Sequence, residues 1–182
     1  MKLSLVLLLL VLSSFAPPQP KLTTTKLSKE LSVGVPTGFV TMPDAGIAQK
    51  YPAARKPVAV YTNLSGRVDF SISVRPTTFE SMDYGVLIKV YKASIQRLYS
   101  KVEFLKEDIR TVNGRDYVAF EFVSTVTDNG RTTRLAPIRR YQYVQYAIQQ
   151  NSIFVFGFVA PAEEQAQWQP TARAVMDALV LK

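Results

Sequence analysis

Four arginines lie within ten consecutive residues, 131–140. They are Arg131, Arg134, Arg139 and Arg140, and no acidic residue lies among them. Guanidinium groups gathered on one loop can converge on a phosphate or carboxylate, because each offers a planar set of N–H donors. Tyr141 and Tyr143 follow directly, and their rings would add flat contact surface of the kind found at many interfaces. These six residues form the candidate site for an anion or a partner.

A structural explanation of the same arginines is the alternative. Charged side chains keep a long hairpin tip soluble and protect the edge of a sheet from pairing with another chain. Exposed charged loops are common, so this explanation is the more frequent one for such a run.

The chain contains no histidine and no cysteine, which excludes imidazole and thiol chemistry. Imidazole bases, His-containing triads, thiol nucleophiles and the usual zinc sites all need one of these residues. Walker A, G-x-S-x-G and G-x-G-x-x-G sequences are also absent. The tripeptide Asp128-Asn129-Gly130 is similar to the start of a calcium loop, but position twelve would be Arg139. We therefore expect a turn there, and neither a metal nor a cofactor in the protein.

Carboxylates remain as possible catalytic groups, because two acids suffice for glycoside hydrolysis. Glu121 is the one acid inside a strongly apolar strand, while Asp69 and Asp116 lie near strand starts. The simplest interpretation puts all three on the solvent side of an alternating pattern. A hydrolase that uses carboxylates or a tyrosine on an envelope polymer or phosphoester is thus the second hypothesis. The first is a binding or accessory module that is not an enzyme.

Residues 1–16 have the layout of a secretory signal peptide. Lys2 precedes an unbroken apolar run over Leu3–Leu12, and small residues follow up to Ala16. Ten helical residues rise about 15 Å against a hydrocarbon core of about 30 Å, so we expect no transmembrane anchor. The missing cysteine excludes both lipoprotein acylation and disulfides. The expected location is periplasmic or extracellular.

The charge balance favours anionic partners. Without Lys2 the chain has 21 basic and 14 acidic residues, a net charge of +7. Such a charge attracts lipid headgroups, phosphate-rich polymers and nucleic acid alike. Export argues against nucleic acid, so we expect an envelope protein or an anionic envelope component as partner. The sequence does not predict an oligomeric state.

The elements that would position these residues include three long strands in a row. The strands are Arg115–Thr127, Arg139–Gln149 and Ser152–Ala160. Their apolar residues recur with a period of two, as Phe154, Phe156 and Phe158 do in the last strand. Short polar turns join them, so the pattern predicts an antiparallel meander.

Shorter elements precede and follow the meander. Strands are predicted at Leu31–Val35 (as an edge strand), Phe39–Met42, Val58–Thr62, Arg67–Arg75 and Lys101–Val112. Helices are predicted at Asp44–Lys50, with Asp44 as N-cap, at Asp83–Ser100, and after Pro161, where Pro170 is expected to divide a lead-in turn from the last helix. The buried residues of the long helix are expected to be Leu87, Val90, Tyr91, Ser94, Ile95 and Leu98. Val102, Phe104 and Ile109 are expected to turn inward from their strand.

Taken together, these elements predict an extended leader over residues 17–30 and a single α+β domain over residues 31–182. The domain would be an antiparallel sheet of about six strands with helices packed on its faces.

Three short motifs and this order of elements resemble the PsbP-like α/β/α superfamily, the fold type of PsbP and DcrB. The motifs are Val35-Pro36-Thr37-Gly38-Phe39, Val74-Arg75-Pro76 leading to Asp83-Tyr84-Gly85, and Asn113-Gly114-Arg115-Asp116-Tyr117. The chain is most similar to the small exported bacterial members of unknown function. The resemblance implies a binding or assembly module without catalysis, and no functional residue of the family has a clear counterpart here.

Overall fold

The structure is a computed structural model that describes residues 20–52, 56–78, 84–127 and 136–182. The expected signal peptide over residues 1–16 lies outside the described residues, as do Arg131, Arg134 and the turn at residues 128–130. No helix within the described ranges is long and apolar enough to cross a membrane.

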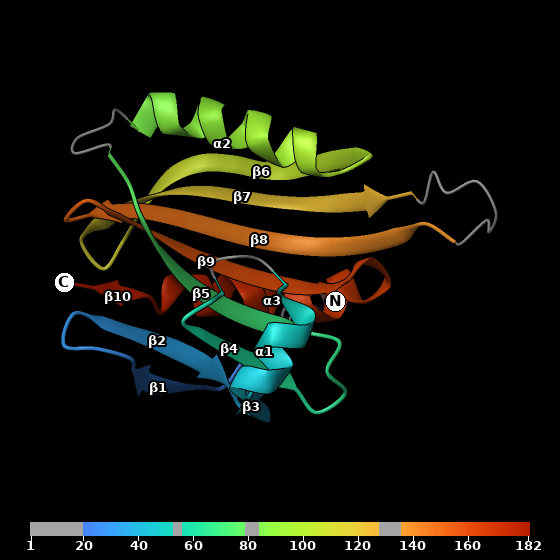
Figure 1. The fold of residues 1–182 in the computed structure, drawn as a ribbon, viewed down its shortest axis with the longest axis horizontal. Helices are drawn as coiled ribbons and strands as arrows, with labels where there is room; N and C mark the ends of the chain where they lie inside the picture. The colour runs from blue at the N-terminus through green and yellow to red at the C-terminus, as the bar shows by residue number, and fades with distance from the viewer. Residues whose placement is uncertain (1–19, 53–55, 79–83, 128–135) are drawn as a thin grey trace, which may run out of the picture.

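A seven-stranded antiparallel sheet forms the centre of the molecule (Figure 1). Its strands, in spatial order, are β3 (Phe39–Thr41), β4 (Ala59–Asn63), β5 (Asp69–Pro76), β9 (Ser152–Pro161), β8 (Ile138–Gln149), β7 (Arg115–Val126) and β6 (Lys101–Val112). A smaller antiparallel sheet has the order β1 (Leu22–Lys26), β2 (Leu31–Pro36) and β10 (Val180–Leu181). The predicted meander is confirmed, and β6 extends it to four strands.

Helices cover both faces of the large sheet. The helical elements are α1 (Asp44–Lys50), α2 (Tyr84–Leu98), the 3-10 turn η1 (Ala162–Glu164) and α3 (Gln165–Asp177). Figure 1 shows α2 lying along β6 and β7, whereas α3 packs on the opposite face and also contacts β2 of the small sheet. The predicted α+β fold, an antiparallel sheet with helices on its faces, is therefore confirmed.

Each face of the large sheet has its own hydrophobic core. On one face Phe120 and Phe122 of β7 pack beneath Leu87 and Ile95 of α2. On the other face, residues of β5, β7, β8 and β9 pack against α3 and the small sheet. The alternation along β7 predicts this division, because successive side chains of a strand point to opposite faces.

The small sheet differs from the sequence-based expectation. Leu22–Lys26, assigned to a leader, pairs with β2, and Val180–Leu181 pairs with the other edge of β2. The predicted edge strand is therefore the centre of its sheet. The pattern did not reveal β1 because Leu22 is its only aliphatic contact with the core, and β10 is too short to show a period.

Four local expectations are also wrong. Pro43 is the N-cap of α1, so Asp44 lies in the first turn instead. Val90, Ser94 and Leu98 are exposed, because the side of α2 that meets the sheet is centred on Leu87, Tyr91 and Ile95. Ile109 pairs with Val118 on the α2 face but is 46% exposed at the edge of the sheet. Pro170 lies inside α3 without ending it. The helix continues beyond it because Ala172, Val175 and Met176 pack into the core.

The hydroxyl of Tyr117 gives a first testable prediction. This oxygen is buried and has no hydrogen-bond partner among the described residues, and burial raises the pKa of Tyr117 to about 12. An unfolded tyrosine ionises near 10. The folded state therefore binds the proton more tightly, and its stability falls as the pH rises from 10 to 12.

We expect Tyr117→Phe to raise the free energy of unfolding by about 1 kcal/mol at neutral pH, because it removes an unpaired buried polar group. Between pH 10 and 12 the free energy of unfolding should also fall less steeply in the variant, because the contribution of the Tyr117 proton is gone. Urea unfolding at neutral pH and at several values between pH 10 and 12 measures both effects. Equal alkaline slopes in the two proteins would contradict the assignment.

Candidate functional site

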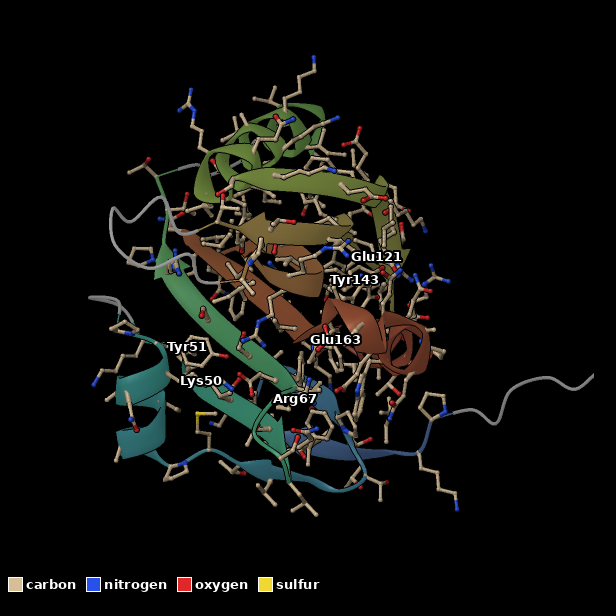
Figure 2. All side chains as sticks on the ribbon, turned by 90° about the vertical axis from the view of Figure 1, so that its right-hand side faces the viewer. Lys50, Tyr51, Arg67, Glu121, Tyr143 and Glu163 are labelled. Carbon is tan, nitrogen blue, oxygen red and sulfur yellow. The ribbon has the colours of Figure 1, made fainter. Side chains whose placement is uncertain are left out.

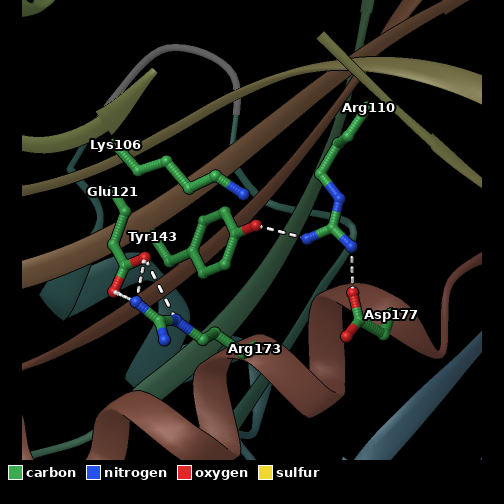
Figure 3. Close-up of a pocket in the computed structure, with 6 residues that line it drawn as sticks. All are labelled: Lys106, Arg110, Glu121, Tyr143, Arg173 and Asp177. Atoms are coloured by element: carbon green, nitrogen blue, oxygen red, sulfur yellow. Dashed lines mark hydrogen bonds and ion pairs between the residues drawn. The ribbon is translucent and has the colours of Figure 1, made fainter. Parts of the chain in front are cut away.

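A hollow of about 420 Å³ opens between the edge of the large sheet and α3 (Figure 3). Six side chains from β6, β7, β8 and α3 line it. They are Lys106, Arg110, Glu121, Tyr143, Arg173 and Asp177. Figure 2 shows Glu121 and Tyr143 close together beside α3, on neighbouring strands.

An irregularity in β6 brings Lys106 and Arg110 to this face. Phe104 pairs with Phe122 on the α2 face, but the register shifts at Leu105, and Lys106 then pairs with Glu121. A shift of one residue turns every later side chain to the opposite face of the strand. Without the bulge, Lys106 and Arg110 would point toward α2.

Glu121 is held by donors from two elements. Its side chain is fully buried, and Arg173 Nη2 and Nε lie 3.1 and 3.2 Å from its Oε2 atom. The Tyr141 hydroxyl donates to Oε1 at 2.9 Å, and the side-chain amide of Gln169 donates to the same oxygen. Burial, and then the nearby Glu121 carboxylate, raise the pKa of Tyr141 well above its usual range. Tyr141 therefore stays protonated and remains a donor.

A second set of contacts joins Arg110 to Tyr143 and Asp177. Arg110 Nη1 donates to the Tyr143 hydroxyl oxygen at 2.5 Å, and Arg110 Nη2 donates to Asp177 Oδ1. The Gln145 amide also donates to the Tyr143 oxygen, at 3.4 Å. These contacts hold Arg110 between a buried phenol and a surface carboxylate.

The lining combines three cations with two carboxylates, and an arginine already pairs with each carboxylate. Lys106 and Arg173 are about half exposed, at 51% and 52%, so their charges reach the solvent. The hollow is therefore richer in N–H donors than in free acceptors. The described ranges contain no cluster of three or more histidine, cysteine, aspartate or glutamate side chains that could hold a metal ion.

Only part of the predicted site comes together in the described residues. Tyr141 and Tyr143 are 0% and 1% exposed, so the expectation that their rings offer flat contact surface is wrong. The α3 helix covers that face of β8. Arg139 and Arg140 are adjacent in β8, and their side chains therefore point to opposite faces of the sheet. Arg131 and Arg134 lie outside the described residues.

The expectation that Glu121 and Asp69 face solvent is also wrong, because both are buried. Asp69 forms a separate cluster with α1: Lys50 Nζ lies 2.7 Å from its Oδ2 atom, and the Tyr51 hydroxyl donates to Oδ2 at 2.8 Å. Lys50 and Tyr51 lie far from Glu121 in Figure 2. Burial and Asp69 raise the pKa of Tyr51, so this cluster fastens α1 to the sheet with a neutral phenol. Asp116 is exposed, as expected.

Neither a family model nor a curated protein sequence matches this chain. Several solved structures share its fold, among them the following three. Cyanobacterial PsbP (CyanoP) from Synechocystis is 12% identical with a TM-score of 0.63, and the match covers 90% of this chain and 94% of that one. The Ran-binding protein Mog1p from Saccharomyces cerevisiae is 14% identical, with a TM-score of 0.57 and coverage of 89% and 96%. LpqN from Mycobacterium tuberculosis, involved in cell envelope biogenesis, is 13% identical, with a TM-score of 0.51 and coverage of 87% and 90%. The chain thus has the PsbP-like fold that its motifs predicted.

Proposed function

We propose that this protein is an exported binding or accessory module of the cell envelope that is not an enzyme and holds an anionic group of its partner. The observation that carries the proposal is the hollow beside α3, where Lys106, Arg110 and Arg173 surround a space of about 420 Å³. Its volume lies within the usual range of ligand sites, about 300–1,000 Å³. The signal-peptide pattern of residues 1–16 supports export.

The state of the two carboxylates supports binding over catalysis. A general acid or nucleophile needs an oxygen that is free to meet the substrate. Glu121 instead accepts hydrogen bonds from Tyr141, Gln169 and Arg173. Asp177 is paired with Arg110 at the rim. A hydrolase that used Glu121 would first have to break its buried ion pair, so we place this alternative second.

The fold is compatible with binding roles in other proteins. It occurs in a Ran-binding protein and in a protein involved in cell envelope biogenesis. Those likenesses concern the fold, and the case for an anionic ligand here depends on the charges of the hollow.

Lys106→Gln tests the proposal, with Lys92→Gln as a matched control. Each lysine pairs with one acid, and both are partly exposed, but Lys92 lies on α2, across the sheet from the hollow. Citrate and glycerol phosphate are suitable probes for isothermal titration calorimetry at low and physiological salt. At physiological salt we expect Lys106→Gln to weaken binding severalfold and Lys92→Gln to leave it nearly unchanged, because exposed charges separated by more than the Debye length of about 8 Å are screened. Equal losses in both variants, or no binding by the wild-type protein, would contradict a specific site.

The arginine run is a second proposed contact for an anionic surface. Arg139 is exposed near the start of β8, and Arg131 and Arg134 precede it in the sequence. We expect the combined replacement of Arg134, Arg139 and Arg140 by glutamine to reduce retention on anionic vesicles at low salt. Cosedimentation measures the fraction of protein retained on the vesicles. Unchanged retention would leave these arginines with a solubilising role only.

A further inference from the structure

Three exposed aliphatic side chains lie at one end of the large sheet. Leu98 ends α2 and is 71% exposed, Val126 ends β7 and is 44% exposed, and Ile138 begins β8 and is 56% exposed. Val126 and Ile138 are direct partners in the register of the two strands. Single exposed aliphatic residues are ordinary on a protein surface, whereas a group of them marks a contact with another surface.

Hydrogen bonds hold the end of α2 beside the end of β7. The Ser100 amide, two residues after Leu98, donates to the Thr125 carbonyl at 3.0 Å. The Thr127 amide donates to Ser100 Oγ at 3.1 Å, so the two contacts flank Val126. Figure 1 shows the end of α2, the end of β7 and the start of β8 at the same end of the molecule. The three aliphatic side chains therefore belong to one surface.

Exposed cations accompany the aliphatic side chains. They are Arg97 on α2, Lys101 on β6 and Arg139 on β8, and none of them forms an ion pair with another described residue. Three described segments form this end of the sheet, residues 97–101, 125–127 and 136–140, and none contains an acid. The sequence that joins β7 to β8 adds two arginines and one aspartate, which keeps the charge balance positive.

A lipid bilayer with anionic headgroups matches both features of this surface. Aliphatic side chains gain free energy when they enter the boundary between headgroups and acyl chains, and basic residues near that boundary bind acidic lipids. A bilayer is broad, so the residues need to lie at one end of the molecule but need not converge on one point. A soluble anionic polymer would engage the cations but offers no apolar layer to the aliphatic side chains.

We infer that this end of the sheet docks on an anionic bilayer. The side chains of Leu98, Val126 and Ile138 enter the interface, and the three cations bind lipid headgroups. The inference rests on the proposed function, whose arginine run includes Arg139, and it specifies that the anionic surface is a membrane.

The test removes aliphatic surface without changing the charge. Leu98→Gln/Ile138→Thr is compared with Val86→Gln/Ile109→Thr, which alters exposed aliphatic residues of a helix and a strand elsewhere. Val86 lies near the other end of α2, about 18 Å from Leu98 at the helical rise per residue. Cosedimentation uses vesicles of phosphatidylglycerol and phosphatidylcholine in equal parts. The first variant should bind at least about tenfold more weakly than the wild-type protein, because membrane binding scales with the buried apolar area. The second should bind as the wild-type protein does.

A fluorescent label reports entry into the bilayer directly. The chain has no cysteine, so Ile138→Cys and Ile109→Cys each provide a single position for an environment-sensitive dye. The same vesicles should shift the emission of the dye at position 138 to shorter wavelength and leave that at position 109 unchanged. Circular dichroism checks that every variant is folded.

Four results would overturn the inference. Full vesicle binding by Leu98→Gln/Ile138→Thr would show that charge alone acts, and the proposed contact of the arginine run would stand. Equal losses in the two double variants would show that the effect is not specific to this end of the sheet. A wild-type dimer without lipid that becomes a monomer in Leu98→Gln/Ile138→Thr would assign the surface to a second copy of the chain. Absence of vesicle binding by the wild-type protein would exclude the membrane, and calorimetry on the hollow would still decide the proposed function separately.

Discussion

Replacing Arg173 by glutamine is expected to lower the free energy of unfolding by about 2–3 kcal/mol, less than for a fully buried ion pair because Arg173 is about half exposed and its charge is partly screened. The loss arises because Glu121 stays behind as a buried carboxylate without its cation. Glu121 has no exposed surface, and Arg173 is the one cation bonded to it among the described residues. Without Arg173 the carboxylate keeps only the neutral donors Tyr141 and Gln169. Urea unfolding followed by circular dichroism measures the loss.

A double-mutant cycle separates the ion pair from other effects of Arg173. The variant Glu121→Gln/Arg173→Gln buries no charge, so we expect it to recover much of the stability that Arg173→Gln loses. Arg67→Gln is the control. Arg67 pairs with Glu163 and Glu164 at the surface, where an ion pair contributes about 1 kcal/mol or less. If the double variant were as unstable as the sum of the single variants, Glu121 and Arg173 would not be coupled.

Alternation predicted the large sheet because its long inner strands β7, β8 and β9 are buried on both faces by different neighbours. Along β7, Phe120 and Phe122 meet α2, while Tyr117 and Ala119 meet the core on the α3 side. Aromatic and β-branched residues give such strands a clear signal. The helices were found for the same reason, since their apolar residues repeat at helical spacing.

The small sheet was not predicted because β1 and β10 are held to β2 largely by backbone hydrogen bonds. Three consecutive threonines in β1 pair with β2 but leave no apolar alternation to detect. The amide of Lys182 donates to the carbonyl of Glu30, a contact between residues far apart in sequence. Such pairings depend on where the chain returns in space, and local residue types do not encode that.

The hollow escaped prediction for two physical reasons. Its residues come from four elements spread between Lys106 and Asp177, so no local motif contains them. The bulge at Leu105 also changes which residues of β6 share a face, and nothing in the local alternation marks its position. Glu121 was recognised as unusual in an apolar strand, but its burial depends on Gln169 and Arg173 of α3. An acid in an otherwise apolar strand therefore indicates a hydrogen-bonding or cationic partner on the helix that covers the strand.

Phe158→Ala is the second large prediction, and it concerns the contact between the large sheet and α3. Phe158 is fully buried on β9, and its ring centroid lies 6.3 Å from that of Phe39 on β3 and 6.3 Å from that of Trp168 on α3. Removal of the ring leaves a cavity that three separate elements would have to close. We expect a loss of about 3–5 kcal/mol in the free energy of unfolding, as for other buried phenylalanines.

Phe154→Ala provides the matched control on the same strand and the same face. Phe154 lies four residues earlier on β9 and is only partly buried, so its removal exposes less new surface and leaves a smaller cavity. We expect its cost to be clearly below that of Phe158→Ala, because the penalty grows with the volume of the cavity that remains. Thermal and urea unfolding of both variants decide the point. Equal losses in the free energy of unfolding would mean that the packing of α3 and β3 does not depend on Phe158. The most tightly packed part of the core on the α3 side would then lie elsewhere.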